Sequence, residues 1–121
     1  MKKSIDALFL PADGQIINVN LPGEAAAFNE CVCQLLGAET YDCLRTRIDG
    51  VLMLVDDNGK LNRCRYNAIA TDLYGVLADC IVGDAVLVCA GEDDFTSIGK
   101  HERKAIYDAL GWNGGIFDGE F

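Results

Sequence analysis

Short apolar runs separated by turn sequences are the feature that most restricts how this chain can fold. Turn residues occur as Pro-Ala-Asp-Gly at 11–14, as Asp-Gly at 49–50 and as Asp-Asp-Asn-Gly at 56–59. Asp-Gly and Asn-Gly pairs between apolar residues are typical of β-hairpins, because these residues accept the backbone angles of a tight turn. The sequence therefore predicts a largely antiparallel sheet that is built from hairpins.

The expected strands follow from these turns. The first two form a hairpin, the next three form a meander, and one strand comes later, beginning at or interrupted by Gly83 and Asp84. The expected strands cover residues 4–10, 15–21, 41–48, 51–55, 61–66 and 80–91. The run at 51–55 is apolar on both faces, which favours a central position in the sheet.

Three helices are expected between and after these strands, at 22–37, 68–78 and 100–111. In the first, apolar residues recur at helical spacing and the pattern stops at Gly37. Asn67 is suited to the N-cap of the second helix. The fold class is therefore α+β: a mainly antiparallel sheet with about three helices packed on one face, forming a single domain over residues 1–111.

Charge restricts the partners. The chain has 121 residues with nineteen Asp and Glu against ten Lys and Arg, which gives a formal net charge of −9. Such a surface disfavours non-specific binding to DNA, RNA or anionic membranes. We therefore expect no direct contact with nucleic acid or membrane, and a basic partner such as a nucleic-acid-binding protein suits the charge better.

The N-terminus resembles the start of a signal peptide, but its apolar run is interrupted by Asp6 and ends at Pro11. That run is too short and too polar for export. No stretch approaches the roughly twenty apolar residues needed to span a bilayer. We therefore expect a cytoplasmic protein.

The six cysteines and the single histidine, His101, do not form a recognisable metal site. Cys31 and Cys33 form a C-x-C pair and the others are dispersed, whereas structural zinc sites usually show two close ligand pairs. We expect the cysteines to be small buried hydrophobic residues. No Ser-His-Asp or Cys-His arrangement is recognisable, so we expect no metal, no cofactor, no catalytic residues and no enzymatic activity.

Half of the positive charge lies in the twenty-one residues from Arg45 to Arg65. Because side chains alternate between faces along a strand, Arg45 and Arg47 share one face of the expected strand 41–48. Arg63 and Arg65 share one face of the expected strand 61–66. With the apolar sets facing the core, four arginines would flank the apolar strand 51–55 on the outer face of the meander.

Three interpretations of this arginine cluster remain open. In the first, the cluster is a solvated face whose charges discourage unwanted strand pairing. In the second, it is a site for a phosphate-bearing small ligand. In the third, it is an interface with a protein or a second copy of the chain. Tyr66 and Trp112 are available to stack on a base. The candidate binding residues are Arg45, Arg47, Arg63, Arg65, Tyr66 and Asn67.

The C-terminal segment 112–121 combines glycines with large apolar groups, including Trp112, Phe117 and Phe121. Disordered tails are usually poor in aromatic residues. We therefore expect the tail to dock, either on its own domain or in the groove of a neighbouring copy. Docking on a neighbour would make the protein a homo-oligomer.

Several stretches carry a family resemblance: "FLPADGQIINVNLPG", "LLGAET", "VDDNGKLNRCRYNAIAT" and "CIVGDAVLV". Together they resemble a small uncharacterised domain family of phages, plasmids and other mobile elements, mostly of Gram-positive gut bacteria. The resemblance covers most of residues 5–90. Its later features are an Asn-x-x-Ala segment and a Gly-Asp strand, which are Asn67, Ala70, Gly83 and Asp84 here.

The resemblance brings no assigned catalytic residues. Family members often have apolar residues and a proline before the asparagine, where this chain has "RCRY". That departure makes Arg63 and Arg65 candidates for a role particular to this protein.

The resemblance implies a mobile-element accessory protein in the cytoplasm of a bacterial host cell, acting in counter-defence. It would bind and block a host defence protein, presenting its acidity to a nucleic-acid-binding groove. Alternatively, it would be an oligomeric sponge that sequesters a nucleotide immune signal on its arginines. A hydrolase of such a signal is a further alternative.

Overall fold

The computed structural model describes residues 4–59, 64–75, 80–92 and 94–111. Within these ranges the chain forms an α+β fold with a six-stranded antiparallel sheet and three helices. The strands are β1 (Ser4–Leu10), β2 (Ile17–Pro22), β3 (Tyr41–Arg45), β4 (Val51–Asp56), β5 (Ala85–Ala90) and β6 (Phe95–Thr96). The helices are α1 (Ala25–Leu36), α2 (Ala68–Tyr74) and α3 (Lys100–Ala109).

The strand order is β2-β1-β5-β4-β3, with the short β6 paired to β5. The first hairpin and the β3–β4 pair are confirmed. Residues 61–63 of the expected third strand of the meander lie outside the described residues. Residues 64–66 do not form a strand, and among them only Tyr66 makes an isolated bridge, to Val82. β5 takes the place beside β4, because a central strand needs apolar residues on both faces. All of β5 except Ala90 is buried, whereas Arg65 is exposed.

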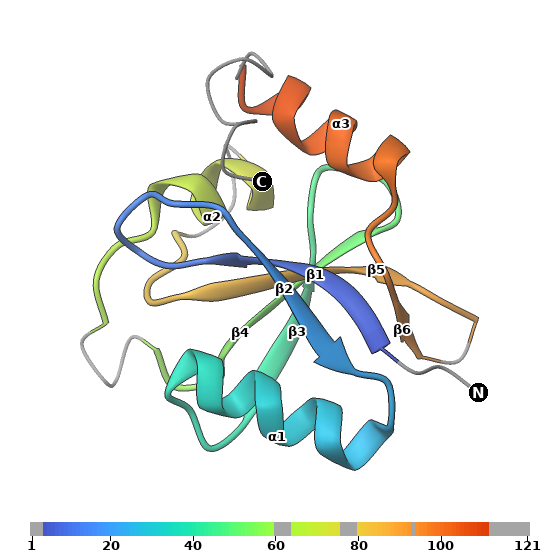
Figure 1. The fold of residues 1–121 in the computed structure, drawn as a ribbon. Helices are drawn as coiled ribbons and strands as arrows, with labels where there is room; N and C mark the ends of the chain where they lie inside the picture. Colours follow the sequence, from blue (N-terminus) through green and yellow to red (C-terminus); the bar gives the residue numbers. More distant parts are fainter. Residues whose placement is uncertain (1–3, 60–63, 76–79, 93, 112–121) are drawn as a thin grey trace.

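Helices cover both faces of the sheet, not one face as expected (Figure 1). Side chains alternate along each strand, so each strand contributes to two apolar layers. In β4, Val51, Met53 and Val55 join the layer that holds Leu73 of α2 and Ile106 of α3. The other layer lies under α1 and is formed by Ile5, Ala7, Leu21, Phe28, Val32, Leu36, Leu54, Val86 and Val88.

Helix α1 begins and ends with local hydrogen bonds. The Glu24 carboxylate accepts hydrogen bonds from the backbone N–H groups of Ala26 and Ala27, at 3.1 and 2.9 Å. These bonds hold the pKa of Glu24 below its ordinary value. Gly37 ends the helix with φ of 64°, a left-handed conformation that favours glycine. None of the helices in the described ranges is long and apolar enough to cross a membrane.

The buried side chain of Asn67 joins three parts of the chain. Its Nδ2 donates to the carbonyl oxygens of Leu10, at the end of β1, and Gly83, just before β5, at 2.9 Å each. Its Oδ1 accepts from the N–H of Ala70 at 3.0 Å, so the predicted N-cap of α2 is confirmed. Its backbone N–H donates to the carbonyl of Ile81. We call this set of contacts the Asn67 junction.

Two further residues complete the Asn67 junction. Gly83 has φ of 82°, and a Cβ at this position would lie 3.1 Å from the Cβ of Cys64. Asp84 accepts a hydrogen bond from the N–H of Ala12 at 2.8 Å, which fixes the turn after β1. The positions that carry the family resemblance therefore act together in holding the fold: Asn67, Ala70, Gly83 and Asp84.

Replacing Asn67 tests the importance of this junction. Asn67→Ala removes the N-cap and leaves buried backbone groups of Leu10, Gly83 and Ala70 without their partner. We expect the free energy of unfolding to fall by about 2–4 kcal/mol, measured by urea denaturation. Asn58→Ala, in an exposed turn, is the matched control and should change it by less than about 0.5 kcal/mol. Equal effects of the two substitutions would contradict the structural role of Asn67.

Candidate functional site

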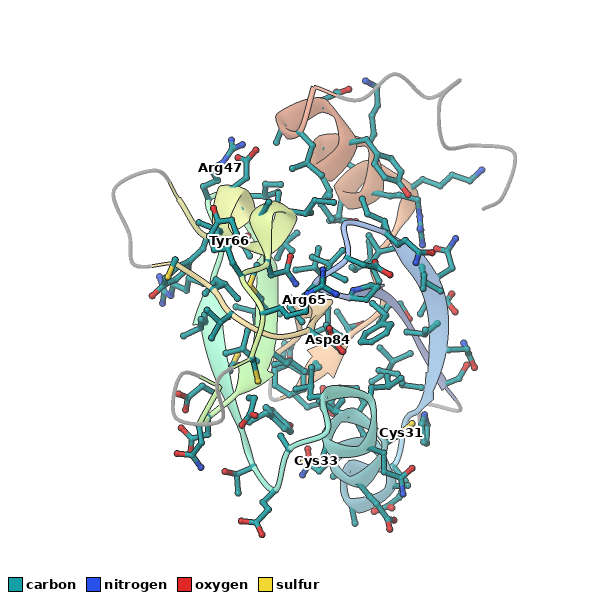
Figure 2. The ribbon with its side chains drawn as sticks, turned by 90° about the vertical axis from the view of Figure 1, so that its left-hand side faces the viewer. Cys31, Cys33, Arg47, Arg65, Tyr66 and Asp84 are labelled. Carbon is teal, nitrogen blue, oxygen red and sulfur yellow. The ribbon has the colours of Figure 1, made fainter. Side chains whose placement is uncertain are left out.

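The described arginines do not share one face. Arg45 ends β3 and lies opposite Leu52, on the side of the sheet that α1 covers. Arg47 lies in the turn after β3, beside α2, and Arg65 lies apart from it near Asp84 (Figure 2). Arg63 lies outside the described residues. The predicted arginine face on one meander is therefore wrong for the three described arginines, Arg45, Arg47 and Arg65.

Two features of the backbone explain this correction. β3 ends at Arg45, three residues earlier than expected, and the residues from Cys64 to Tyr66 do not form a strand. The expected outer apolar floor is also missing, since Met53 and Leu54 are both fully buried, on opposite faces of β4. Strand β4 is a core strand between two helical layers.

Arg47 is a structural residue that joins two helix ends. Its Nε donates to the carbonyl of Asp72 at 2.8 Å, and its Nη2 donates to the Asp72 carboxylate at 2.6 Å and to the carbonyl of Ala109 at 3.0 Å. Asp72 and Ala109 lie in the last turns of α2 and α3, whose carbonyl groups lack partners within the helix. A cation there also interacts favourably with both helix dipoles.

Asn67 cannot contact a ligand, because its exposed fraction is 0% and its amide is occupied by backbone groups. Its proposed role in binding is therefore corrected to a structural one. Tyr66, by contrast, is 56% exposed. Arg65 lines a hollow of about 290 Å³ together with Pro11, Leu36 and Asp84. The adjacent residues Arg65 and Tyr66 are thus both accessible.

The expected interface residues Trp112, Phe117 and Phe121 lie outside the described residues, and docking of the tail stays a prediction.

The cysteines differ from expectation. Only Cys89 is buried, three are partly exposed, and Cys43 and Cys80 are exposed; all six are free. Burial raises the pKa of the Cys43, Cys64 and Cys89 thiols, which disfavours the reactive thiolate. Across the described ranges, no group of three or more His, Cys, Asp or Glu residues is arranged to hold a metal ion.

An acidic hollow of about 250 Å³ lies beside the edge strand β3 and is lined by Asp42, Asp56 and Asp57. A hydrogen bond with Asp57, and the negative charge of Asp57, raise the pKa of the Asp42 carboxyl. Thr40 donates a hydrogen bond to Asp57. The hollow thus concentrates negative charge near the start of β3.

Among the described residues, the side of the sheet that α1 covers is mainly acidic. The sequence from residue 4 to residue 44 contains six Asp and Glu residues and no Lys, Arg or His. Three of them, Glu24, Glu30 and Glu39, lie exposed on or next to α1, and we call this surface the acidic α1 side. Helix α3, on the opposite face, has mixed charge: it carries Lys100, His101, Arg103 and Lys104 together with Glu102 and Asp108.

An apolar groove of about 490 Å³ opens on the same side, between the N-terminal half of α1 and the end of β5. We call it the α1 groove. The rings of Phe28 and Phe95 lie 5.4 Å apart, centre to centre, within it. Apart from them, its lining consists of Ile5, Gly23, Ala25, Asn29, Tyr41, Leu52, Ala90, Gly91, Glu92 and Asp94.

Sequence reasoning missed the α1 groove. Its residues come from five separated segments, and Phe28 and Leu52 appear in the sequence only as members of a helical pattern and of an apolar strand. The available signal was the absence of basic residues from residue 4 to residue 44. That signal indicates the charge of the surface but not its shape.

Comparison with protein families matches residues 8–111 to a domain described as "Domain of unknown function (DUF3846)". The match covers most of the chain and confirms the resemblance to an uncharacterised domain family. Comparison with curated proteins finds no match. Comparison with solved structures also finds none.

Removing the Arg47 side chain should destabilise the fold, because this side chain has a structural role and does not form part of a ligand-binding site. We expect Arg47→Ala to lower the free energy of unfolding by about 1–2 kcal/mol, because three hydrogen bonds at two helix ends are lost. Arg45→Ala, at an exposed position of β3, is the control and should change it by less than about 0.5 kcal/mol. Chemical denaturation of both variants measures this free energy. If the free energy of unfolding of Arg47→Ala equalled that of the wild type, the structural role of Arg47 would be contradicted.

The contact between Asp42 and Asp57 in the acidic hollow predicts how the Asp42 carboxyl titrates. The raised pKa of Asp42 means that stability from its protonated form is present at low pH and is lost as the pH rises through that pKa. Asp57→Asn should lower the pKa of Asp42, as followed by carboxyl-carbon NMR. Asp49→Asn is the control and should leave it unchanged. A pKa of Asp42 that does not respond to Asp57→Asn would show that Asp57 is not its cause.

Proposed function

The chain belongs to the DUF3846 family, and we propose that this member is a non-enzymatic accessory protein of a phage or other mobile element. In this proposal it acts in the cytoplasm of a bacterial host cell, where it binds and blocks a defence protein. The acidic α1 side contacts the surface with which that defence protein holds nucleic acid. The mobile-element context comes from the family resemblance of the sequence.

The observation that carries the proposal is the acidic α1 side itself. Forty-one consecutive residues, 4–44, contribute no basic side chain, and Glu24, Glu30 and Glu39 are exposed on or beside one helix. A surface of one charge attracts a partner of the opposite charge and increases the rate of encounter. Grooves that bind nucleic acid are rich in Lys and Arg, so they are complementary to this surface.

The arrangement of the described arginines weakens the nucleotide-sponge alternative. A phosphate group is held best by several donors that converge on it. Arg47 is hydrogen-bonded to Asp72 and Ala109. Arg45 ends β3 opposite Leu52, whereas Arg65 lines a hollow with Pro11 and Asp84. The blocking role therefore has better support than the sponge, and the hydrolase alternative has no specific observation in its favour among the described residues.

The proposal is tested first in cells. Bacteria that carry individually cloned defence systems are infected with phage in the presence and absence of this protein. We expect plaque numbers to be restored for at least one system whose effector binds nucleic acid. That effector, purified, should form a stoichiometric complex with the full chain by size-exclusion chromatography with light scattering. The complex should weaken as salt is raised, because salt screens exposed charges.

Charge reversal on the acidic α1 side gives the sharper test. The double variant Glu30→Lys and Glu39→Lys should raise the Kd of this complex by about tenfold or more, since reversed charges repel a basic partner. The double variant Asp49→Lys and Asp108→Lys has the same net charge, but its changes lie in the β3–β4 turn and on α3. It should bind within about threefold of wild type. Equal losses in the two variants would contradict the proposed surface.

A further inference from the structure

The floor of the α1 groove is apolar and only partly covered. Ile5 and Phe28 are buried in the layer under α1, and Leu52 and Phe95 are half-buried beside them. Their exposed surfaces face the groove. Contiguous exposed apolar surface next to charged residues often marks a contact site, so the groove can bury an apolar group of a partner.

The walls of the groove are held by defined contacts. The ring centres of Phe28 and Phe95 lie 5.4 Å apart, a separation typical of aromatic pairs. The hydroxyl of Tyr41 donates a hydrogen bond to Asn29, which links β3 to α1 across one wall. A volume of about 490 Å³ lies within the range of roughly 300–1,000 Å³ that is typical of binding pockets. The groove is therefore preformed and large enough for one aromatic side chain and its neighbours.

The rim of the groove is acidic. Glu92 and Asp94 are exposed and line it on the side of β5 and β6, and no Lys or Arg belongs to its described lining. The pairing of β3 with β4 places one basic residue, Arg45, on this face, opposite Leu52. The charge of the rim therefore favours cations, and Arg45 opposes them from one side.

We infer that the α1 groove holds the anchor of the partner: a segment with one aromatic or large aliphatic side chain, flanked by Lys or Arg. The anchor fills the space above Phe28 and Phe95, and the flanking cations lie against Glu92. A buried anchor within a polar rim is the usual arrangement of a binding hot spot. This inference rests on the proposed function and specifies which part of the acidic side makes the specific contact.

Charge also distinguishes this occupant from others. The chain's own segment 112–121 has aromatic residues, but its charged side chains are Asp118 and Glu120, which the acidic rim would repel. A second copy of the chain brings a net charge of −9 to the same surface. A basic segment of another protein satisfies both the apolar floor and the acidic rim.

Three synthetic peptides test the inference on the full chain by fluorescence anisotropy. The first carries a central phenylalanine between Lys and Arg residues, the second replaces that phenylalanine by glycine, and the third replaces the basic residues by glutamate. We expect the first peptide to bind at least about tenfold more tightly than either of the others at low salt. Equal binding of the first two would overturn the anchor, and equal binding of the first and third would overturn the role of the rim.

Substitutions in and near the α1 groove test whether the first peptide binds there. Glu92→Lys should weaken the first peptide by about tenfold, and Arg45→Ala should tighten it by about twofold, because it removes a like charge. Asp49→Lys, with the same change in charge as Glu92→Lys, is the matched control and should leave the Kd unchanged. Leu52→Ala should weaken the first peptide but not the second, after circular dichroism has confirmed folding. If neither Glu92→Lys nor Leu52→Ala changed the Kd of the first peptide, the assignment of its binding site to the α1 groove would be wrong.

This test separates the inference from the proposed function. Suppose that both basic peptides bind with equal Kd and that only the double variant Glu30→Lys and Glu39→Lys changes this Kd. The α1 groove is then not the anchor site, whereas the acidic α1 side still binds basic partners. If the anchored peptide binds in the groove but no defence effector forms a complex, the site stands and the blocking role fails.

Discussion

The hydrogen bonds of the Asn67 amide are the interaction on which the rest of the structure depends. They join the end of β1, the start of α2 and Gly83, two residues before β5. β5 lies between β1 and β4, so the two hairpins of the sheet meet only through it. A buried amide that is fully paired fixes one arrangement, because any other would leave polar groups unpaired in the core. The position of β5 therefore depends on Asn67.

This arrangement separates the scaffold from the surface that we propose for binding. The residues that carry the family resemblance, among them Asn67 and Gly83, are buried or hold turns. These positions therefore help to hold the fold, and membership of the family leaves the activity open. The acidic α1 side and the α1 groove lie at the other helical layer of the sheet, where charge can be changed with little effect on the junction.

Local features of the fold were predictable and non-local ones were not. The hairpin β1–β2, the end of α1 at Gly37 and the N-cap at Asn67 depend on residues that are neighbours in sequence. The arginine face failed because alternation assigns side chains to faces but does not determine which strands are adjacent. The α1 groove could not be predicted, since Phe28, Leu52 and Phe95 meet only after β5 has been inserted into the sheet.

Native mass spectrometry of the full chain, purified from bacterial cells and mixed with cyclic and linear nucleotides, tests the central claim most directly. That claim is that the acidic α1 side acts on a protein partner and that the arginines do not trap a nucleotide signal. The account predicts a chain that carries no phosphate-rich ligand, before or after nucleotides are added. A nucleotide that stays bound through purification, and that is lost on Arg65→Ala, would contradict it.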